Sequence, residues 1–464
     1  MSYSGTTRRA AFDVLQAVHD KDAYSNLVLP AVLDELKVSS RDAGLATEIT
    51  YGALRRQGSL DAVIDACASR TDTMDSKVRN ILRVGAYQLL FMRIPAHAAV
   101  DETVTLARDV AGMGVSKFVN AVLRKISAST WEEWLETLSK GKTPVEVLAL
   151  EYSYPVWVIR SLADAYKCDL DSIREVLAAG NEPALVSLVA KPGQADVTEL
   201  LELPHVEPGR WSPIAATMLR PSGSDEKWST RPGDIDAVRD NRIGVQDEGS
   251  QLVALAVAKV EIQGTQTHWL DMCAGPGGKA AILAGLASEA GADFTALEPI
   301  PARAHLVSNS LWNAPGDHQV IETDAREFNP DHQFDRILVD APCTGLGALR
   351  RRPEARWRRQ PSDIPPLTAL QQELLAKAGE LVRVGGVVGY ATCSPHLAET
   401  DAIVANFLKR NPNFETVDVS PVLPQLNLPK GSMNLRLRPD VRLARLKPWV
   451  YEFRRAYFLL TLAT

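Results

Sequence analysis

The sequence predicts an α/β fold with a mixed, mostly parallel sheet in its C-terminal half, preceded by an all-α N-terminal region. From about residue 246, short apolar runs of strand length alternate with longer helical patterns, which is typical of right-handed crossovers in a parallel sheet. Before residue 140, apolar residues recur at spacings of three and four, the period of a helix. We therefore predict an all-α domain over 1–140, a linker and small α/β subdomain over 141–245, and a larger α/β domain over 246–464.

The N-terminal region is predicted to be helical throughout. Helical periodicity runs through residues 8–18, 26–33, 43–67, 77–92, 98–111 and 116–126. Lys and Arg over 1–140 number 17, and so do Asp and Glu, so this domain is balanced in charge. The middle part adds a helix from Pro155 to Tyr166 and a short strand over 184–191.

The C-terminal region alternates strands with helices. We predict strands over 267–272, 293–298, 318–323, 335–340 and 386–391, and helices over 276–290, 300–313, 366–383 and 397–409. The apolar run from Tyr451 to Leu462 is a further strand, which we expect to close the sheet antiparallel as one half of a final hairpin.

Composition limits the class of protein. The chain has 464 residues, 45% of them hydrophobic, and a net charge of −6, so any contact with nucleic acid must come from local patches. Five cysteines without regular spacing indicate reduced thiols in a cytoplasmic protein. We expect neither a signal peptide nor a membrane span, and no pairing of Cys with His predicts a metal site.

A glycine-rich loop follows the first strand of the large domain, in Cys273-Ala-Gly-Pro-Gly-Gly-Lys279. Glycines allow a backbone to approach a ligand closely. The spacing fits neither a Walker loop nor the dinucleotide fingerprint, because Cys273 and Ala280 stand where those motifs need other residues. Acids end the next three strands, at Glu298, Asp324 and Asp340. This order suits the ribose, adenine and sulfonium of S-adenosylmethionine.

Two cysteines also follow strands, Cys343 in Asp-Ala-Pro-Cys-Thr and Cys393 in Ala-Thr-Cys-Ser. A thiolate that adds to carbon 6 of a pyrimidine turns carbon 5 into a nucleophile that can accept a methyl group, and a base must then remove the carbon 5 proton. We expect a cation such as Lys279, or the sulfonium, to favour the thiolate. Cys273 is expected to line the cofactor pocket, and Cys67 and Cys168 to be small buried hydrophobes.

An arginine-rich run follows Cys343. Residues 350–359 hold six Arg, one Glu and Trp357, a local charge of +5. Because the run is flanked by glycine and adjoins a proposed reactive thiol, we predict that it contacts RNA phosphates.

These motifs resemble the RNA (cytosine-C5) methyltransferases of the NOL1/NOP2/Sun group. The matching segments are LDMCAGPGGK, ALEP, IETDA, LVDAPCTGLGALRRRPEARW and YATCSPHLAET. The N-terminal region is similar to NusB-like RNA-binding domains, for example in Leu82-Arg-Val-Gly-Ala-Tyr-Gln-Leu and Phe118-Val-Asn-Ala-Val-Leu-Arg-Lys. The resemblance implies a Rossmann-like methyltransferase domain that uses S-adenosylmethionine, joined to a NusB-like domain.

The resemblance also implies roles for the site residues. It makes Cys393 the nucleophile, gives Cys343 the release of the product, and places Asp340 at the cytosine; Lys279 remains the catalytic candidate that the thiolate argument named. A Pro-Cys nucleophile in DNA cytosine methyltransferases keeps Cys343 as a competitor for the first role. The implied cofactor contacts are Cys273, Ala274, Gly275, Pro276, Gly277, Gly278, Lys279, Glu298, Asp324 and Asp340.

Three functions remain open at this point. The resemblance favours methylation of a cytosine in 16S ribosomal RNA, either free or in a small-subunit assembly intermediate. We expect the protein to be a monomer. The same chemistry on transfer RNA is a second function, because the pocket motifs do not encode the identity of the RNA. A non-catalytic RNA-binding assembly factor is the third, although such a protein needs neither thiol.

Overall fold

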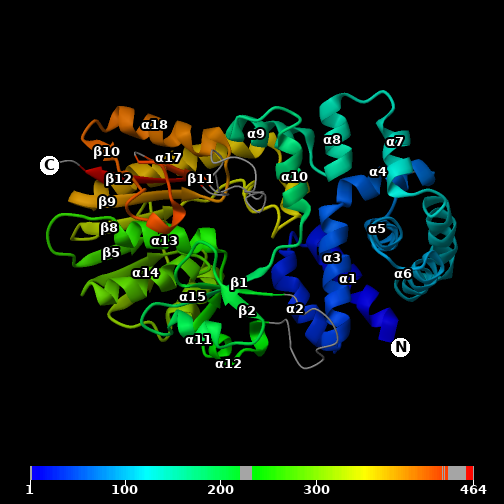
Figure 1. Cartoon of the computed structure of the whole chain (residues 1–464), viewed down its shortest axis with the longest axis horizontal. Helices are drawn as coiled ribbons and strands as arrows, with labels where there is room; N and C mark the ends of the chain where they lie inside the picture. The colour runs from blue at the N-terminus through cyan, green and yellow to red at the C-terminus, as the bar shows by residue number, and fades with distance from the viewer. Residues whose placement is uncertain are drawn as a thin grey trace. The chain divides into compact units, whose positions relative to one another are not determined.

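The computed structural model of the chain describes residues 3–69, 71–219, 232–430, 432, 434–436 and 456–462. It divides into two compact units, coloured by residue number in Figure 1. The first, here called the helical unit, comprises Met1–Pro183 together with Ala348–Arg359. The second, the α/β unit, comprises Ala184–Gly347 and Gln360–Thr464. None of the described helices is long and apolar enough to cross a membrane.

The helical unit confirms the predicted helical period. Its α-helices are α1 (Tyr3–Asp20), α2 (Ser25–Glu35), α3 (Ser40–Arg55), α4 (Gln57–Cys67), α5 (Ser76–Phe91), α6 (Ala96–Ile126), α7 (Trp131–Ser139), α8 (Pro144–Tyr152), α9 (Val156–Tyr166), α10 (Ile173–Asn181) and α16 (Ala355–Arg358). The periodic segment 43–67 is two helices, because the chain leaves helical geometry at Arg56. A side-chain cap begins α3 at Ser39, and a capping box begins α7 at Thr130.

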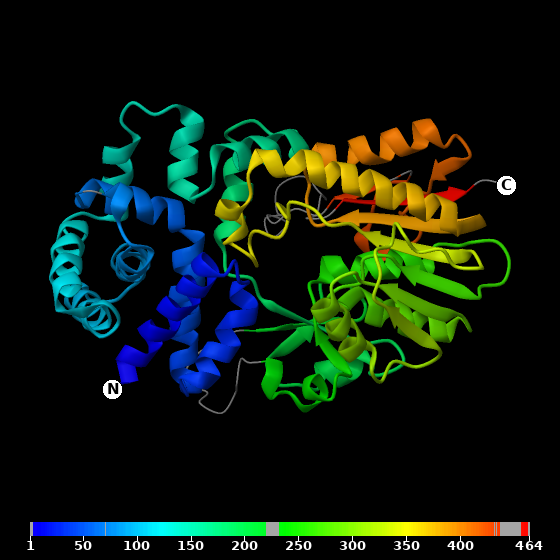
Figure 2. The same cartoon turned by 180° about the vertical axis from the view of Figure 1, so that it is seen from behind.

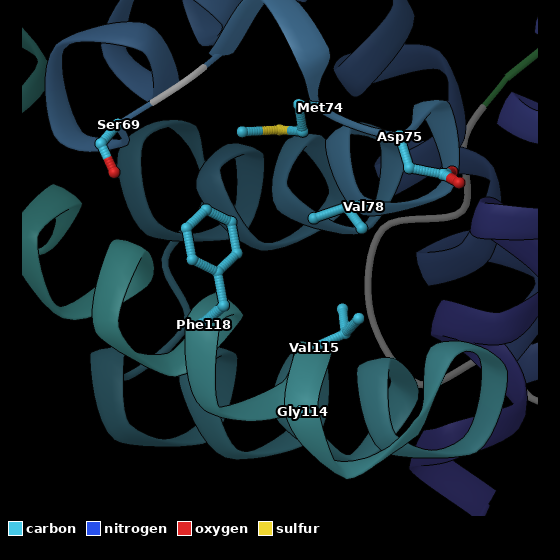
Figure 3. Close-up of a pocket in the computed structure, with 7 residues that line it drawn as sticks. All are labelled: Ser69, Met74, Asp75, Val78, Gly114, Val115 and Phe118. Carbon is cyan, nitrogen blue, oxygen red and sulfur yellow. The ribbon is translucent and has the colours of Figure 1, made fainter.

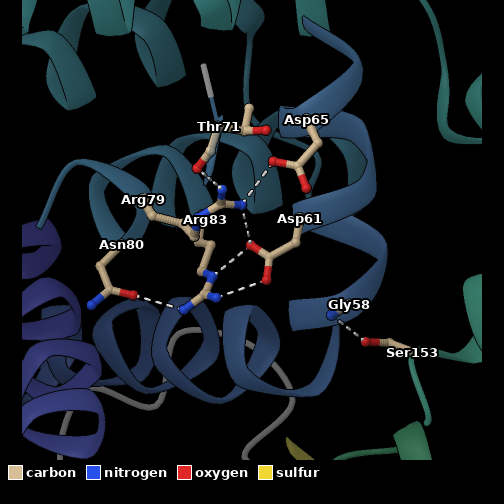
Figure 4. Close-up of polar contacts among 8 residues, drawn as sticks. All are labelled: Gly58, Asp61, Asp65, Thr71, Arg79, Asn80, Arg83 and Ser153. Carbon is tan, nitrogen blue, oxygen red and sulfur yellow. Dashed lines mark hydrogen bonds and ion pairs between the residues drawn. The ribbon is translucent and has the colours of Figure 1, made fainter. Parts of the chain in front are cut away.

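Ion pairs fix α4 against α5 (Figure 4). Arg83 donates to both carboxylate oxygens of Asp61, at 2.8 and 2.7 Å. Arg79 lies 3.5 Å from Asp61 and 3.0 Å from Asp65. Because these arginines already have carboxylate partners inside the unit, they do not form a free basic face.

A shallow hollow opens where α6 bends. Gly112 has a φ of 88° inside α6, a left-handed conformation that favours glycine, so the two predicted helices 98–111 and 116–126 continue across a kink. The hollow has a volume of about 260 Å³ and is mostly apolar (Figure 3). Its lining residues are Ser69, Met74, Asp75, Val78, Gly114, Val115 and Phe118.

The arginine-rich run is built into the helical unit. Arg356 is fully buried, and its guanidinium donates to the carbonyl oxygens of Arg55 and Gly180 at 3.0 Å each and to Asn181 Oδ1 at 2.7 Å. It also lies 3.7 Å from the ring centre of Tyr154. Burial lowers the pKa of Arg356 to about 10, which still leaves it charged at neutral pH.

Other residues of the run have internal partners as well. Glu354 accepts from the backbone N and the hydroxyl of Ser25, at 3.3 and 2.9 Å, at the start of α2. Arg358 donates to the carbonyl oxygen of Ala23 at 2.9 Å. The prediction that this run is a phosphate-binding face is therefore wrong for Arg356 and Arg358, because carbonyl groups of the helical unit hold them.

The α/β unit contains the predicted parallel sheet. β5 (His268–Asp271), β6 (Asp293–Leu297), β7 (His318–Ile321), β8 (Phe334–Asp340) and β9 (Val382–Thr392) pair in parallel, in the order β9-β8-β5-β6-β7. The chain runs outward from β5 to β7 and then returns to the other side of β5. This reversal creates a switch point between β5 and β8, and ligands of such sheets bind at the carboxyl ends of the strands there.

Helices cover both faces of this sheet (Figure 1, Figure 2). One core joins α13 (Glu248–Lys259), α14 (Gly278–Glu289) and α15 (Pro301–Leu311) to alternate strand residues such as Trp269, Phe294 and Leu338. The other core joins α17 (Ile364–Leu381) and α18 (Asp401–Arg410) to the intervening residues, such as Leu270, Leu297 and Val339. The period of two along each strand sends side chains to opposite faces.

Antiparallel strands complete the unit. β12 (Ala456–Leu462) pairs antiparallel with β9, β10 (Phe414–Thr416) and β11 (Asn434–Arg436). The predicted C-terminal strand is thus confirmed over 456–462, whereas 451–455 lie outside the described residues. A separate antiparallel sheet has the order β2-β3-β1-β4, with bounds Val206–Pro208, Ala215–Met218, Val186–Ala190 and Ile243–Val245.

Candidate active site

Three strand ends bring the predicted site residues together in the α/β unit. The glycine loop follows β5, Asp340 ends β8 with Cys343 three residues after it, and Cys393 follows β9. The neighbouring strands β8 and β9 carry their loops side by side, with Gly347 N donating to the carbonyl oxygen of Cys393 at 2.8 Å. The Sγ atoms of Cys343 and Cys393 are 3.1 Å apart. Two thiols that are fifty residues apart in sequence are therefore in contact.

Two glycines of the loop, Gly275 and Gly277, are packed so closely that a Cβ atom would not fit at either position. A Cβ on Gly275 would lie 2.2 Å from Glu298 Oε2, and one on Gly277 would lie 2.6 Å from Ser310 Cβ. Gly277 also has a φ of 107°, in the left-handed region. The loop leads into α14, whose first backbone N–H groups have no partners within the helix.

The predicted acids have different partners. Glu298 is 2% exposed and pairs with Arg303 at 3.2 Å, and Arg303 in turn donates to the carbonyl oxygen of Gly275 at 2.8 Å. Asp324 is bound by Arg326, with 2.7 Å between Oδ2 and Nη2, and this arginine lowers the pKa of Asp324. The sequence did not predict the contacts of Arg303 with Glu298 and of Arg326 with Asp324. In each case the arginine reaches the carboxylate only because the chain after the strand folds back on itself.

Lys279 pairs with Asp340 through a short contact between Nζ and Oδ2. Its side chain is 10% exposed and that of Asp340 26%. The sequence suggested that Lys279 favours a cysteine thiolate, but its ammonium group is held by the carboxylate that precedes Cys343. The pair places one cation and one anion at the switch point between β5 and β8.

The pKa values of two thiols of the site, those of Cys273 and Cys343, are raised. Burial, followed by the charge of Asp271, raises the pKa of Cys273 well above its usual value. The contact with Cys393 and then burial raise the pKa of Cys343, and the charges of Glu399 and Asp340 add to this effect. Of the helical-unit cysteines, Cys67 is 5% exposed, which confirms the prediction that it is buried, whereas Cys168 is only half-buried and the same prediction is wrong for it.

Asp271, at the end of β5, is a further acid that the motifs did not single out. Its side chain is 1% exposed. Burial raises its pKa to about 7, with Lys279 opposing the shift and Asp340 adding to it. A buried acid beside the glycine loop therefore changes its charge near neutral pH.

We expect Asp271→Asn to remove a pH dependence of folding stability. The unfolded carboxyl releases its proton near pH 3.8 and the folded one near pH 7, so its contribution to stability is full below pH 3.8 and is lost as the pH rises to 7. The loss is at most about 4 kcal/mol. Urea unfolding between ~pH 4 and ~pH 8 measures this. The exposed Asp317→Asn is the matched control, and equal pH slopes for wild type and Asp271→Asn would contradict the expectation.

A group of buried polar side chains holds the two cysteine loops. Glu399 and Gln371 are fully buried, and Glu399 accepts from Thr344 N at 2.8 Å and from Gln371 Nε2 at 3.2 Å. The hydroxyl oxygen of Thr344 lies 3.0 Å from Ser394 Oγ, within hydrogen-bond distance. Sequence reasoning gave none of these four residues a role, because a Glu or Gln on a helix is most often exposed.

The loop surroundings fit a bound cofactor with hydroxyl groups. The side-chain N and O atoms of Gln246 are both buried without a hydrogen-bond partner, and the side chain lies 3.4 Å from where a Cβ on Gly278 would be. Buried polar groups of this kind usually find partners. The carboxylate of Glu298 can accept from neighbouring hydroxyls of a ligand. Among the described residues, no group of three or more His, Cys, Asp or Glu is placed to hold a metal ion.

Comparison with known proteins agrees with this arrangement. The family described as 16S rRNA methyltransferase RsmB/F matches residues 258–442, and the NusB family matches residues 5–128. The Mycobacterium tuberculosis protein named "Putative methyltransferase Rv1407" is 46% identical over 418 residues, 89% of each chain. Ribosomal RNA small subunit methyltransferase B of Vibrio cholerae is 31% identical, with 90% of this chain and 92% of that chain covered.

Solved structures confirm the fold. PH0851 superposes with a TM-score of 0.77 at 21% identity and covers 99% of both chains. NSun6 from Pyrococcus horikoshii with SFG superposes with a TM-score of 0.52 at 14% identity, with 67% of this chain and 98% of that chain covered. The expected Rossmann-like methyltransferase fold, with a NusB-like domain before it, is thus confirmed. By its sequence and its fold, the chain belongs to the RsmB/F family of 16S rRNA methyltransferases.

Proposed function

We propose that the protein transfers a methyl group from S-adenosylmethionine to carbon 5 of a cytosine in 16S ribosomal RNA, through a covalent bond between Cys393 and carbon 6. The single observation that carries this proposal is the 3.1 Å contact between the Cys343 and Cys393 thiols, beside the Lys279–Asp340 pair. Two adjacent thiols serve a reaction that must both form and break a carbon–sulfur bond.

The proposed roles of the chain's residues follow from this chemistry. Cys393 Sγ gives its proton to a base and adds to carbon 6 of the ring, which makes carbon 5 nucleophilic. Bound S-adenosylmethionine supplies the methyl group. After transfer, Cys343 assists removal of the carbon 5 proton, and the Cys393–carbon 6 bond breaks to release 5-methylcytosine. Asp340 accepts from the amino edge of the cytosine, and its contact with Lys279 holds that carboxylate in place.

The proposed cofactor site is the loop from Cys273 through Ala274, Gly275, Pro276, Gly277, Gly278 and Lys279, with acids at the next strand ends. Glu298 accepts from the ribose hydroxyls, Asp324 from the adenine amino group, and Asp340 borders the sulfonium. The close packing of Gly275 against Glu298 supports this assignment, since a larger residue would block the carboxylate. NSun6, which shares the fold, was solved with SFG, an analogue of S-adenosylmethionine.

We expect Glu298→Gln to weaken S-adenosylmethionine binding by roughly 10-fold, because a carboxylate accepts more strongly from hydroxyls than an amide does. Calorimetric titration measures the affinity. Glu322→Ala is the control, because Glu322 is exposed and lies after β7 near the same edge. Unchanged affinity in Glu298→Gln, or an equal loss in the control, would remove Glu298 from the site.

The helical domain over 1–140 is the proposed RNA-binding part, supported by its match to the NusB family. Methyl transfer to protein-free 16S ribosomal RNA, to small-subunit particles and to bulk transfer RNA, followed by mass spectrometry of the nucleosides, tests the proposal. We expect 5-methylcytidine only in the ribosomal samples. The methyl group on transfer RNA, or on another atom, would refute the proposed substrate or position, and no transfer at all would favour an assembly factor.

A further inference from the structure

Glu399 is a buried carboxylate that the proposed reaction does not use. It ends the short helix η4 (Leu397–Glu399) and is fully buried. Its carboxylate accepts from Thr344 N at 2.8 Å, from the Thr344 hydroxyl, and from Gln371 Nε2 at 3.2 Å. All three donors are neutral groups. An ionised carboxylate is costly to bury unless such donors surround it.

The bonds of Glu399 converge on the loop that carries Cys343. Thr344 is the next residue after that cysteine, and Gln371 Nε2 also donates to the carbonyl oxygen of Pro342, the residue before it, at 2.8 Å. The backbone is therefore held on both sides of Cys343 by Glu399 and by Gln371, which Glu399 orients. Gln371 lies on α17, so a rigid helix supports the arrangement.

The same carboxylate also ties this loop to the loop of Cys393. The Thr344 hydroxyl that donates to Glu399 lies 3.0 Å from Ser394 Oγ, next to Cys393. The carbonyl oxygen of Glu399 accepts from the Tyr390 hydroxyl at 2.8 Å, on the strand that leads to Cys393. The two thiols are thus brought into contact by loops that share one buried acid.

We propose that Glu399 is a positioning residue of the two-thiol site, which holds the Pro342–Thr344 backbone against the Cys393 loop and so sets the distance between the thiols. This inference rests on the proposed function for its catalytic meaning, but the thiol geometry can be tested without catalysis. We call the bonds of the Glu399 carboxylate to Thr344 and Gln371 the Glu399 clamp. In Glu399→Gln the amide oxygen can still accept from Thr344 N and Gln371 Nε2, but the NH₂ group then faces the Thr344 hydroxyl, which must accept instead of donate. The isosteric change therefore removes the negative charge and reverses one bond, which weakens the clamp without opening a cavity.

A reagent that bridges two thiols measures their distance directly. Phenylarsine oxide forms two As–S bonds with a pair of neighbouring thiols, while its As=O bond breaks and the two thiol protons leave with the oxygen as water. We expect one such bridge at this site in the wild type and none in Cys343→Ala. In Glu399→Gln, capture of phenylarsine oxide, measured as its binding affinity, should be at least about 10-fold weaker, because a displacement of one thiol by near 1 Å disrupts the geometry that the bridge needs. Asp401→Asn, a neighbouring acid that contacts Thr400, is the matched control and should capture normally.

Turnover supplies the second readout. In Glu399→Gln we expect kcat for methyl transfer to fall by about 10- to 100-fold with KM for RNA and S-adenosylmethionine nearly unchanged. Thr344→Val removes only the bonds of the Thr344 hydroxyl, so it should lose less of both capture and kcat than Glu399→Gln. This variant tests the proposal if Glu399→Gln does not fold. Wild-type capture and kcat in both variants would overturn the proposal. If Glu399→Gln weakens the binding of phenylarsine oxide while the wild type transfers no methyl group, the positioning role of Glu399 stands and the proposed function is refuted.

Discussion

In Cys343→Ala, RNA is expected to remain covalently attached to the protein and to migrate with it on a denaturing gel. Under the proposed mechanism, Cys393 can still add to carbon 6 and the methyl group can still be transferred, but the step assigned to Cys343, which releases the product, is lost. Cys393→Ala should instead lose methyl transfer by roughly 10⁴-fold or more, because the proposed nucleophile is missing. Both effects can be measured with labelled RNA and purified protein.

The double variant separates the two roles. The adduct of Cys343→Ala should disappear in Cys343→Ala/Cys393→Ala, and Cys168→Ala, in the helical unit, should behave as wild type. Sequencing the attached RNA names the modified nucleotide. An adduct that appears only in Cys393→Ala would exchange the roles of the two cysteines.

In Arg356→Ala, we expect the helical unit to lose roughly 3–5 kcal/mol of unfolding free energy. The substitution deletes a buried charge and leaves the carbonyl oxygens of Arg55 and Gly180, together with Asn181 Oδ1, without their donor. Hydrogen exchange of the α10 amides, read alongside urea unfolding, locates the loss in this unit.

Two further variants sharpen this test. Arg352→Ala, in the same run but exposed and stacked 4.9 Å over the Tyr24 ring, should cost less than about 1 kcal/mol. Arg356→Lys should cost nearly as much as the alanine, since an ammonium group cannot reach acceptors on several sides. Equal stability of Arg356→Ala and Arg352→Ala would show that the buried contacts contribute little.

Local patterns predicted the parallel strands and the strand-end site. Apolar runs identify β5, β6 and β8, and in a parallel sheet all their carboxyl ends reach one edge, so the grouping of Asp340, Cys343 and Cys393 follows from strand order. The predicted strand at 386–391 is longer in the structure, Val382–Thr392, because strand pairing extends past the apolar run.

Partners from distant parts of the chain could not be predicted in this way. The acceptors of Arg356 come from α3 and α10, and a local charge count cannot distinguish a buried arginine from a solvated one. Glu399 similarly looks like any helix-end acid until the fold places Thr344 beside it. Long-range hydrogen bonds depend on tertiary approach, which residue periodicity does not encode.

The discontinuous helical unit has a consequence for biosynthesis. Its last segment, Ala348–Arg359, is separated from Pro183 by the 164 residues of 184–347. At ribosomal rates these residues take on the order of 10–30 s to synthesise. During that interval the nascent helices expose the carbonyl oxygens that Arg356 later binds. The backbone N–H and the hydroxyl of Ser25, at the start of α2, also lack their acceptor Glu354. The helical unit therefore completes its folding only after β5, β6, β7 and β8, four of the five parallel strands of the large sheet, have been translated.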